Sequence, residues 1–236
     1  METAEYARMD TAEARMWWYR ALHARLLAAL AGSAGPVLDA GCGTGGFLAA
    51  LRAEQPHTAV CGVEWAAAAA ARAAEKSDAM IVRGTVNALP FSPGSFGAVV
   101  SADVLCHAAV QPDAALAELW RVLRPGGRVV VNLPSYTWLM SSHDSHVHNA
   151  RRYTAGALRR LLLQAGFVDI RTIYWNCLLL PVMVLHRKLL RDPASSDVAP
   201  FSPWLDAVFH RVTELERRYL PWAPAGGSIL AIASRL

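Results

Sequence analysis

The sequence predicts an α/β fold in which helices cover both faces of a parallel sheet. Short apolar runs, the pattern of buried strands, alternate along the chain with longer segments of helical periodicity. The chain has 236 residues, of which 54% are hydrophobic, and this suffices for one domain with a sizeable core. Charged residues amount to only 18%, which excludes disorder over most of the chain.

Composition also restricts the compartment and the chemistry. No apolar run reaches the roughly 18 residues of a membrane span, and residues 1–5 lack the basic-then-apolar order of a signal peptide. The four cysteines are widely spaced, which predicts neither a disulfide framework nor a zinc ribbon. We therefore expect a cytoplasmic protein. The net charge of +4 comes from an arginine-rich last third, and genome composition explains that bias as well as anion binding does.

The first part of the chain contains two units of strand, turn and helix. A long helical pattern over residues 5–30 ends at the Gly/Pro-rich residues 31–36. A strand follows at 36–40, then a glycine-rich turn at 41–46 and a helix at 47–54. The second unit has a strand at 58–64 and an alanine-rich helix at 65–76.

The remaining elements continue this alternation. Strands are predicted at 80–83, 97–101, 128–133, 168–175 and 228–234, and helices at 113–123 and 154–165. Residues 176–225 form an insertion with an apolar stretch at 178–190, a linker at 192–203 and a helix at 204–219. We divide this single domain into an N-terminal helical part (1–32), a core (37–133), a region of loop, helix and insertion (134–225) and a closing strand (226–236).

The glycine-rich turn is the first functional signal. Glycines between a first strand and the next helix let the backbone approach a ligand closely. The spacing of Gly41, Gly43 and Gly46, with Glu64 about 20 residues on, matches the dinucleotide-binding fingerprint. Asp39, two residues before the first glycine, and the Pro-Gly-Gly turn at 125–127 shift the interpretation away from a nicotinamide cofactor.

Residues 37–45, Glu64, Leu89-Pro90-Phe91 and residues 123–127 together resemble the class I S-adenosylmethionine (SAM) dependent methyltransferases. The resemblance spans residues 37–133. It implies a three-layer sandwich with a seven-stranded, mostly parallel sheet and a reversed last strand. It also implies that SAM lies over the carboxyl ends of the first four strands, where open α/β sheets bind ligands.

The resemblance implies a set of cofactor-binding residues. Asp39, Gly41, Gly43 and Gly45 would hold the methionine part, and Glu64 would accept hydrogen bonds from both ribose hydroxyls. At the adenine position Thr85 and Val86 replace the acid that is common in the family. The full expected set is Asp39, Gly41, Cys42, Gly43, Gly45, Glu64, Trp65, Thr85, Val86, Ser101, Ala102 and His107.

The polar loop at 135–152 is the most unusual segment, and three interpretations remain open. Its histidines could bind and deprotonate an acceptor, since a histidine with a pKa near 6.5 accepts a proton at neutral pH. Alternatively, Asp144, His146 and His148 alternate along an extended segment and form a two-His-one-carboxylate metal set. In the third interpretation the polar groups only fix the loop, with Arg151 and Arg152 pairing acids.

Residues 134–225, which we call the acceptor region, follow the part that resembles the family and would bind the molecule that accepts the methyl group. They supply most candidates for catalysis and substrate binding. As base we consider His146, His143, Asp144 and Tyr153, in that order. The expected acceptor-binding residues are Tyr19, Tyr136, His148, Arg151, Arg152 and Trp175. An apolar wall at 178–184 favours a small hydrophobic acceptor, with an anionic head near the arginines, although plain core burial is the commoner role of such residues. By analogy with the family, the aromatic helix with Tyr6, Trp17 and Trp18 would cover SAM.

Several alternatives differ in class. They are a non-catalytic SAM-binding accessory subunit, a NAD-dependent oxidoreductase and a nucleic-acid methyltransferase. The last lacks a base pocket and a lysine-rich arm, so we expect no nucleic-acid partner. We expect a biosynthetic enzyme that releases S-adenosylhomocysteine, acts as a monomer or homodimer, and needs no divalent metal. The sequence leaves contact with a membrane surface open.

Overall fold

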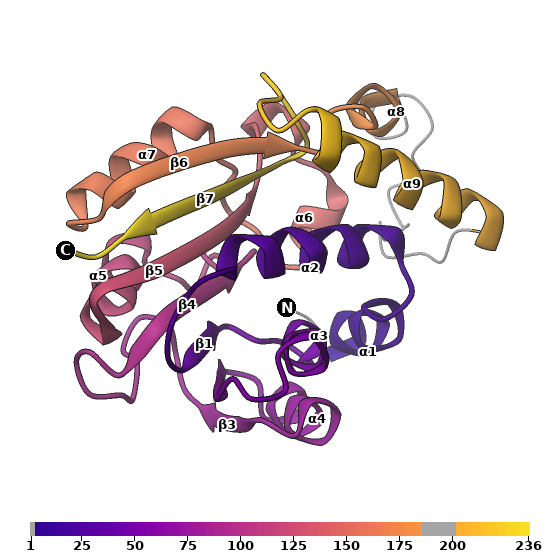
Figure 1. Ribbon diagram of the computed structural model, residues 1–236. Helices are drawn as coiled ribbons and strands as arrows, with labels where there is room; N and C mark the ends of the chain where they lie inside the picture. The colour runs from indigo at the N-terminus through magenta and orange to yellow at the C-terminus, as the bar shows by residue number, and fades with distance from the viewer. Residues whose placement is uncertain (1–2, 186–201) are drawn as a thin grey trace.

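The computed structural model describes residues 3–185 and 202–236, with only the backbone at residues 3, 4, 142 and 143. Its seven-stranded sheet has the order β3-β2-β1-β4-β5-β7-β6 (Figure 1). The strands are β1 (Val37–Ala40), β2 (Val60–Glu64), β3 (Met80–Arg83), β4 (Phe96–Ala102), β5 (Leu123–Pro134), β6 (Val168–Trp175) and β7 (Ser228–Ser234). β7 runs antiparallel to β5 and β6, and the pairs among β1 to β5 are parallel. The predicted α/β class is confirmed.

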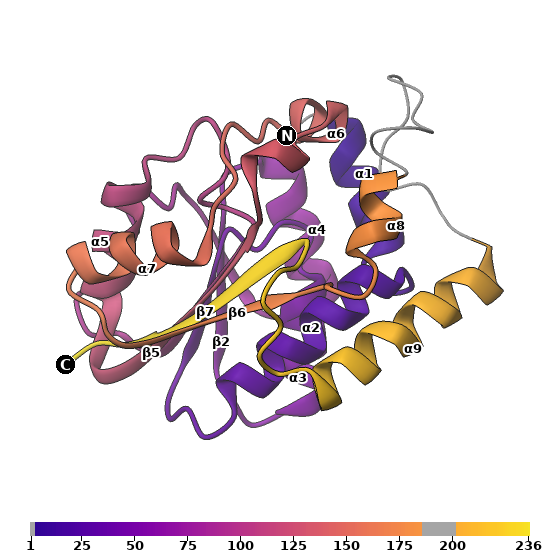
Figure 2. The ribbon, with the colours of Figure 1, turned by 90° about the horizontal axis from the view of Figure 1, so that it is seen from above.

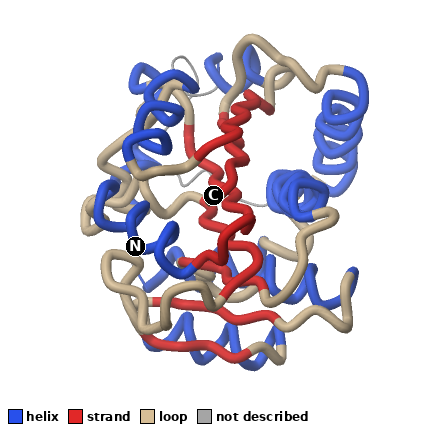
Figure 3. The backbone as a smooth tube through the Cα atoms, turned by 60° about the vertical axis from the view of Figure 1, so that its left-hand side comes forward, coloured by secondary structure: helices blue, strands red, loops and turns tan. Residues whose placement is uncertain are grey.

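Helices cover both faces of this sheet, which forms the central layer in Figure 3. α2 (Trp17–Leu30), α3 (Gly46–Glu54), α4 (Ala67–Ser77) and α9 (Pro203–Tyr219) cover one face, and α5 (Pro112–Val122) and α7 (Ala155–Gln164) the other (Figure 2). Each layer buries its own apolar cluster, with Leu26 and Leu48 on the first face and Leu116 and Leu158 on the second. These strands are buried on both faces, which explains their nearly continuous apolar sequences.

Shorter elements lie at the edge of the sheet where β1, β4 and β5 end (Figure 2). They are α1 (Thr3–Ala12), the 3₁₀ helix η1 (Thr137–Leu139), α6 (Ser142–His146) and α8 (Leu180–Leu185). α8 and α9 belong to the insertion between β6 and β7, as predicted, and most of the predicted linker at 192–203 lies outside the described residues. No described helix is both long and apolar enough to cross a membrane.

Two local predictions were wrong. The helical pattern at 5–30 is divided into α1 and α2 by a turn at 13–15. Tertiary contacts explain the break, because Asp206 of α9 accepts a hydrogen bond from the backbone N–H of Trp17 at 2.7 Å and so satisfies the start of α2. The segment at 135–152 is not a simple loop, since it contains η1 and α6.

Candidate active site

The glycine-rich turn joins the end of β1 to the start of α3. Gly41, Gly43 and Gly45 all have positive φ angles, of 93°, 54° and 86°. Side chains are disfavoured in this backbone conformation, which is readily available to glycine. At Gly45 there is also no space, because a Cβ would lie 2.7 Å from the Cα of Ala73 in α4. The glycines therefore let the turn bend sharply, and Gly45 lets it pack closely against α4.

Glu64, at the end of β2, holds the neighbouring backbone with its carboxylate. Its Oε2 accepts a hydrogen bond from the N–H of Gly43 at 2.9 Å. Its Oε1 accepts from the N–H of Ala66 and from the hydroxyl of Tyr6, each at 2.9 Å. The carboxylate thus connects β2, the glycine-rich turn and α1 in one buried cluster.

Asp39 is a buried carboxyl group without a hydrogen-bond partner among the described residues. It is only 3% exposed. Burial, together with the negative charges of Glu64 and Glu13, raises the pKa of Asp39 to about 8. A buried polar group normally has a partner, so this carboxyl is suited to a ligand that donates hydrogen bonds. Asp39 and Glu64 are the pair of acids that the sequence predicts for cofactor binding.

The helix α1 covers this cluster. Besides the bond from Tyr6, the Cε of Met9 lies 2.6 Å from the position that a Cβ on Gly43 would take. Thr44 donates a hydrogen bond to Glu13 at 2.8 Å, and Lys76 of α4 pairs with both Glu13 and Asp10. A ligand that reaches the turn from this side must therefore displace or contact α1.

Other predicted cofactor-binding residues surround the same sheet edge. Cys42 and Val86 are buried, whereas Trp65 is 74% exposed. The Thr85 hydroxyl accepts a hydrogen bond from the N–H of Asn87 at 3.2 Å. Ser101, near the end of β4, donates to the carbonyl of Ala40 at 3.3 Å.

Two more predicted residues follow at the end of β4. Ala102 ends the strand and pairs in register with Asn132 of β5. The pKa of His107 is lowered to about 4, mainly by burial, so this histidine is neutral at physiological pH.

The predicted acceptor loop is organised around a buried ion pair. The Asp144 carboxylate accepts hydrogen bonds from Nε and Nη2 of Arg152, at 3.0 and 2.9 Å. It also accepts from Ser141 and Asn149. Burial alone would raise the pKa of Asp144, but the bonds and charge of Arg152 lower it below the ordinary value. This geometry supports the interpretation in which Asp144 and Arg152 fix the loop.

The remaining candidates from this loop do not converge on one point. The hydroxyl of Tyr153 donates to the carbonyl of Leu105 at 2.9 Å, and Arg151 donates to the carbonyls of His107 and Val110. His146 is partly buried, and His148 is exposed. The side chain of His143 lies outside the described residues.

Metal-binding groups do not gather in the described part of the chain. No set of three His, Cys, Asp or Glu side chains there could hold an ion, and Asp144, His146 and His148 are all described residues. The proposed two-His-one-carboxylate arrangement is therefore absent from this loop.

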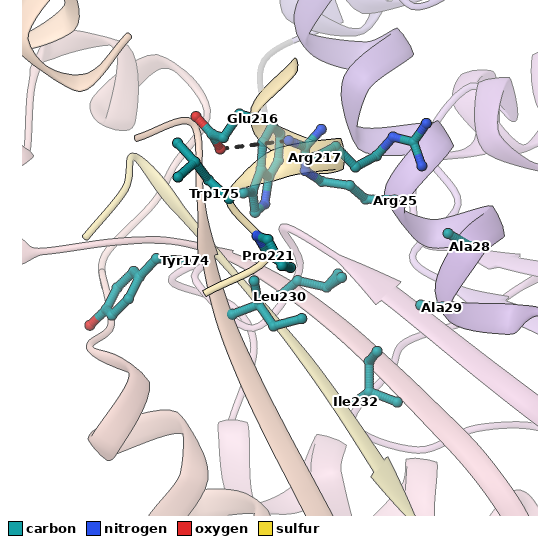
Figure 4. Close-up of a pocket in the computed structure, with 12 residues that line it drawn as sticks. Arg25, Ala28, Ala29, Tyr174, Trp175, Glu216, Arg217, Pro221, Leu230 and Ile232 are labelled. Atoms are coloured by element: carbon teal, nitrogen blue, oxygen red, sulfur yellow. Dashed lines mark ion pairs between the residues drawn. The ribbon is translucent and has the colours of Figure 1, made fainter. Parts of the chain in front are cut away.

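Trp175, at the end of β6, connects three parts of the molecule. Its indole N–H donates to Oδ1 of Asn132 at 2.8 Å. Its ring stacks on Trp18 and lies under the guanidinium of Arg25, 4.6 Å from the ring centroid. The same ring lines a cavity of about 210 Å³ between α2, α9 and the sheet, where Arg25 pairs with Glu216 (Figure 4).

Two of the predicted acceptor-binding residues, Tyr136 and Tyr19, pack against other aromatic rings. Tyr136, after β5, stacks on Tyr174 at 5.4 Å and on Trp138 at 5.7 Å between centroids. Tyr19 of α2 packs edge-on against Trp18. Burial raises the pKa of the Tyr19 phenol well above its ordinary value, so this hydroxyl is a neutral group at physiological pH.

The sequence analysis did not single out Asn132 or Glu216. Asn132 is fully buried and is the one polar residue in the apolar run 129–133 of β5, a signal that was available. Glu216 accepts hydrogen bonds from the backbone N–H groups of Asn176, Cys177 and Leu178. It belongs to an amphipathic helix whose sequence carries no sign of that contact.

Comparison with protein families finds one domain. Residues 38–131 match the model of a methyltransferase domain. The chain is 31% identical over 170 residues to a probable S-adenosylmethionine-dependent methyltransferase of Mycolicibacterium smegmatis, covering 70% of this chain and 64% of the relative. It is 37% identical over 100 residues to the demethylmenaquinone methyltransferase of Thermus thermophilus, covering 40% of this chain and 45% of the relative.

The fold is also shared with solved structures. A SAM-dependent methyltransferase from Thermotoga maritima superposes with a TM-score of 0.64 at 19% identity, covering 99% of this chain and 95% of the other. At this identity the likeness concerns the fold. The chain spans 48%, 30% and 45% of the lengths of the first three curated relatives that it matches.

Proposed function

We propose that the chain is a class I SAM-dependent methyltransferase and that it transfers the methyl group of SAM to a small, apolar acceptor molecule. The observation that carries the proposal is the pair of buried acids on either side of the glycine-rich turn. Asp39 is a carboxyl group at 3% exposure with no hydrogen-bond partner in the part of the chain that the structure describes, and Glu64 is held in place by backbone N–H groups. Glu64 already accepts hydrogen bonds from Gly43, Ala66 and Tyr6, so a ribose diol would use the remaining lone pair of Oε2 and replace Tyr6 on Oε1.

The residues present fit this cofactor. When bound, SAM supplies an electrophilic methyl group on a positively charged sulfur. Glu64 would accept hydrogen bonds from the ribose, and Asp39 would accept them from the methionine part, which would relieve its unpaired burial. Gly41 and Gly43 allow the close approach of backbone to ligand.

The chain's main contribution to the reaction is alignment and the exclusion of water. Holding two reactants in line supplies about 7–11 kcal/mol of the barrier of a bimolecular step. α1 lies over the glycine-rich turn through Tyr6 and Met9. A cover of this kind excludes water from the reacting groups.

An apolar acceptor is supported by the surface at the same sheet edge. Leu178, Val182, Leu185 and Trp138, on and beside α8 and η1, are each about half exposed, between 47% and 52%. Exposed apolar side chains that gather around a site favour a hydrophobic ligand or surface. The name of the Thermus thermophilus relative, a demethylmenaquinone methyltransferase, agrees with an acceptor of this kind.

The test is transfer of label from methyl-labelled SAM into a cell extract that is afterwards divided into organic, aqueous and macromolecular fractions. We expect label in the organic fraction with the wild-type protein. The Glu64→Ala variant should transfer little, whereas Glu75→Ala, which removes an exposed acid from nearby α4, should behave as wild type. Label confined to macromolecules would contradict the small acceptor. No transfer at all would contradict the enzymatic function.

A further inference from the structure

Asp103 follows the last residue of β4 and has an unusual backbone. Its φ angle is +55°, in the left-handed region that residues with a side chain adopt at a cost. The conformation is held by two contacts with β5, because the N–H of Asp103 donates to the carbonyl of Asn132 at 2.8 Å and the side-chain amide of Asn132 contacts the carboxyl. Strained residues of this kind cluster at functional sites.

The orientation of the Asn132 amide is determined by Trp175. An indole N–H can only donate a hydrogen bond, so the amide oxygen of Asn132 must face Trp175, at 2.8 Å. The amide nitrogen therefore faces Asp103 and donates to its Oδ1 at 3.1 Å. Asp103 Oδ1 is thus fixed as an acceptor, while Oδ2 has no hydrogen-bond partner among the described residues.

Asp103 lies between the glycine-rich turn and the acceptor region. Val104, the next residue, packs against Gly41, where a Cβ would lie 2.4 Å from its Cγ2. On the other side, Asn132 belongs to the strand that leads into the acceptor region. The carboxyl group of Asp103 therefore lies where the glycine-rich turn and the acceptor region meet.

Charged and titratable groups face Asp103 from several elements. They are Tyr19 of α2, Asp144 of α6, Arg152 of the loop before α7, and Cys106, whose thiol contacts the Asp103 carbonyl at 3.1 Å. Burial raises the pKa of Asp103 to about 7, the Asn132 bond and Arg152 oppose that shift, and Asp144 adds to it. A base is most effective when its pKa lies near the working pH.

We propose that Asp103 is the general base of the methyl transfer, held in position by Asn132 and Trp175. The role depends on the proposed function. As a lone pair on an acceptor oxygen or nitrogen, or the electron pair released from an acidic C–H bond, forms the bond to the methyl carbon, the bond from the acceptor atom to hydrogen breaks and the proton passes to Oδ2 of Asp103. The bond from methyl carbon to sulfur breaks with both electrons retained by sulfur. The acceptor class is accordingly one that carries an O–H, N–H or acidic C–H group.

The first experiment measures transfer of methyl label into the organic fraction between pH 5.5 and 9. We expect the wild-type rate to rise through one ionisation near pH 7. Asp103→Asn should lower the rate at pH 8 by about 10²–10⁴-fold, the range for removing a general base, and change the Kd for SAM by less than threefold. Asp113→Asn, an exposed acid at the start of α5, serves as control. Retention of more than a third of the rate by Asp103→Asn would overturn the proposal.

A second readout is independent of activity. Carboxyl-labelled aspartate followed by NMR should show one resonance that titrates near pH 7 and is missing in Asp103→Glu, a variant that also serves if Asp103→Asn fails to fold. Trp175→Phe removes the donor that locks the amide, so it should raise this midpoint, because the carboxylate loses a fixed hydrogen bond.

The assignment would be overturned if no aspartate resonance that titrates near pH 7 disappears in Asp103→Glu; the resonance of Asp39, whose pKa is about 8, is identified with Asp39→Asn. Tight SAM binding without transfer by the wild-type protein would instead contradict the proposed function, and the role of Asp103 with it.

Discussion

Glu64 and Glu216 are both buried carboxylates that accept backbone N–H groups, but they join different parts of the chain. Glu64 binds Ala66, two residues away, and Gly43 of the turn next to its own strand. Glu216 reaches from α9 to Asn176, Cys177 and Leu178, which lie 38 to 40 residues away. The proposed cofactor half, around the glycine-rich turn at 41–46, is therefore built mainly by neighbouring strand ends. The proposed acceptor half, around Trp175 and α9, is built by side chains that join distant segments.

This difference predicts that the acceptor half loses more stability when its central acid is removed. Glu216→Ala leaves three N–H groups and the buried Arg25 guanidinium without their carboxylate partner. We expect a loss of about 3–5 kcal/mol in the free energy of unfolding, the range for breaking a buried pair, measured by urea denaturation. Glu214→Ala, on the same helix, removes only a partly exposed pair with Arg217 and should cost less than about 1 kcal/mol. Equal losses in the two variants would contradict the comparison.

Removing the central acid of the cofactor half should affect affinity more than stability. Glu64→Ala should weaken SAM binding by about 2–4 kcal/mol, or 30-fold or more in Kd, because hydrogen bonds to a charged group contribute about 1.5–3 kcal/mol each. Isothermal titration calorimetry measures the difference. A Glu64→Ala protein that binds SAM as tightly as wild type would remove Glu64 from the site.

Asp39 should make stability depend on pH. Its pKa of about 8 exceeds the ordinary value of 3.8, so the folded protein keeps a proton that the unfolded chain releases. The free energy of unfolding from this group falls as the pH rises from about 4 to 8. Asp39→Asn cannot ionise and should flatten the fall by about 1–3 kcal/mol, as denaturation at pH 5 and pH 8 would show. An unchanged pH dependence would show that Asp39 in the folded protein does not hold a proton between pH 5 and pH 8.

Tyr6 should have the smallest effect, on rates. Its hydroxyl occupies an acceptor position on Glu64 and helps to hold α1 over the glycine-rich turn. Tyr6→Phe should therefore speed both association and dissociation of SAM by about threefold to tenfold, the equivalent of one hydrogen bond of about 1 kcal/mol. Stopped-flow fluorescence would measure both rates. Unchanged rates would show that α1 does not limit entry.

The positions of the proposed cofactor-binding residues could be predicted from sequence because their signals are local. Asp39, the glycines and Glu64 lie at strand ends whose order and direction follow from the alternation of strands and helices. The other strands and the insertion between the last two strands were predictable for the same reason, whereas β5 begins at Leu123, five residues before the predicted start. The division of the first helix was not, since it depends on Asp206 of α9.

The acceptor half was less predictable because the sequence does not show whether a polar residue there pairs with another side chain inside the protein or is free to contact a ligand. The histidines and Asp144 form a dense polar run, yet Asp144 forms a buried ion pair with Arg152. Asp103 and Asn132 lie in apolar surroundings, and only the pairing of β4 with β5 and the position of Trp175 show that they form one chain of hydrogen bonds. Such contacts depend on strand order as much as on residue type.

The central claim is that the acids beside the glycine-rich turn bind SAM, and calorimetric titration of the wild-type protein with SAM and, separately, with NAD tests it most directly. We predict one SAM per chain with a Kd at or below the micromolar range and no measurable heat from NAD. Binding of NAD in preference to SAM, or no binding of SAM, would contradict the account.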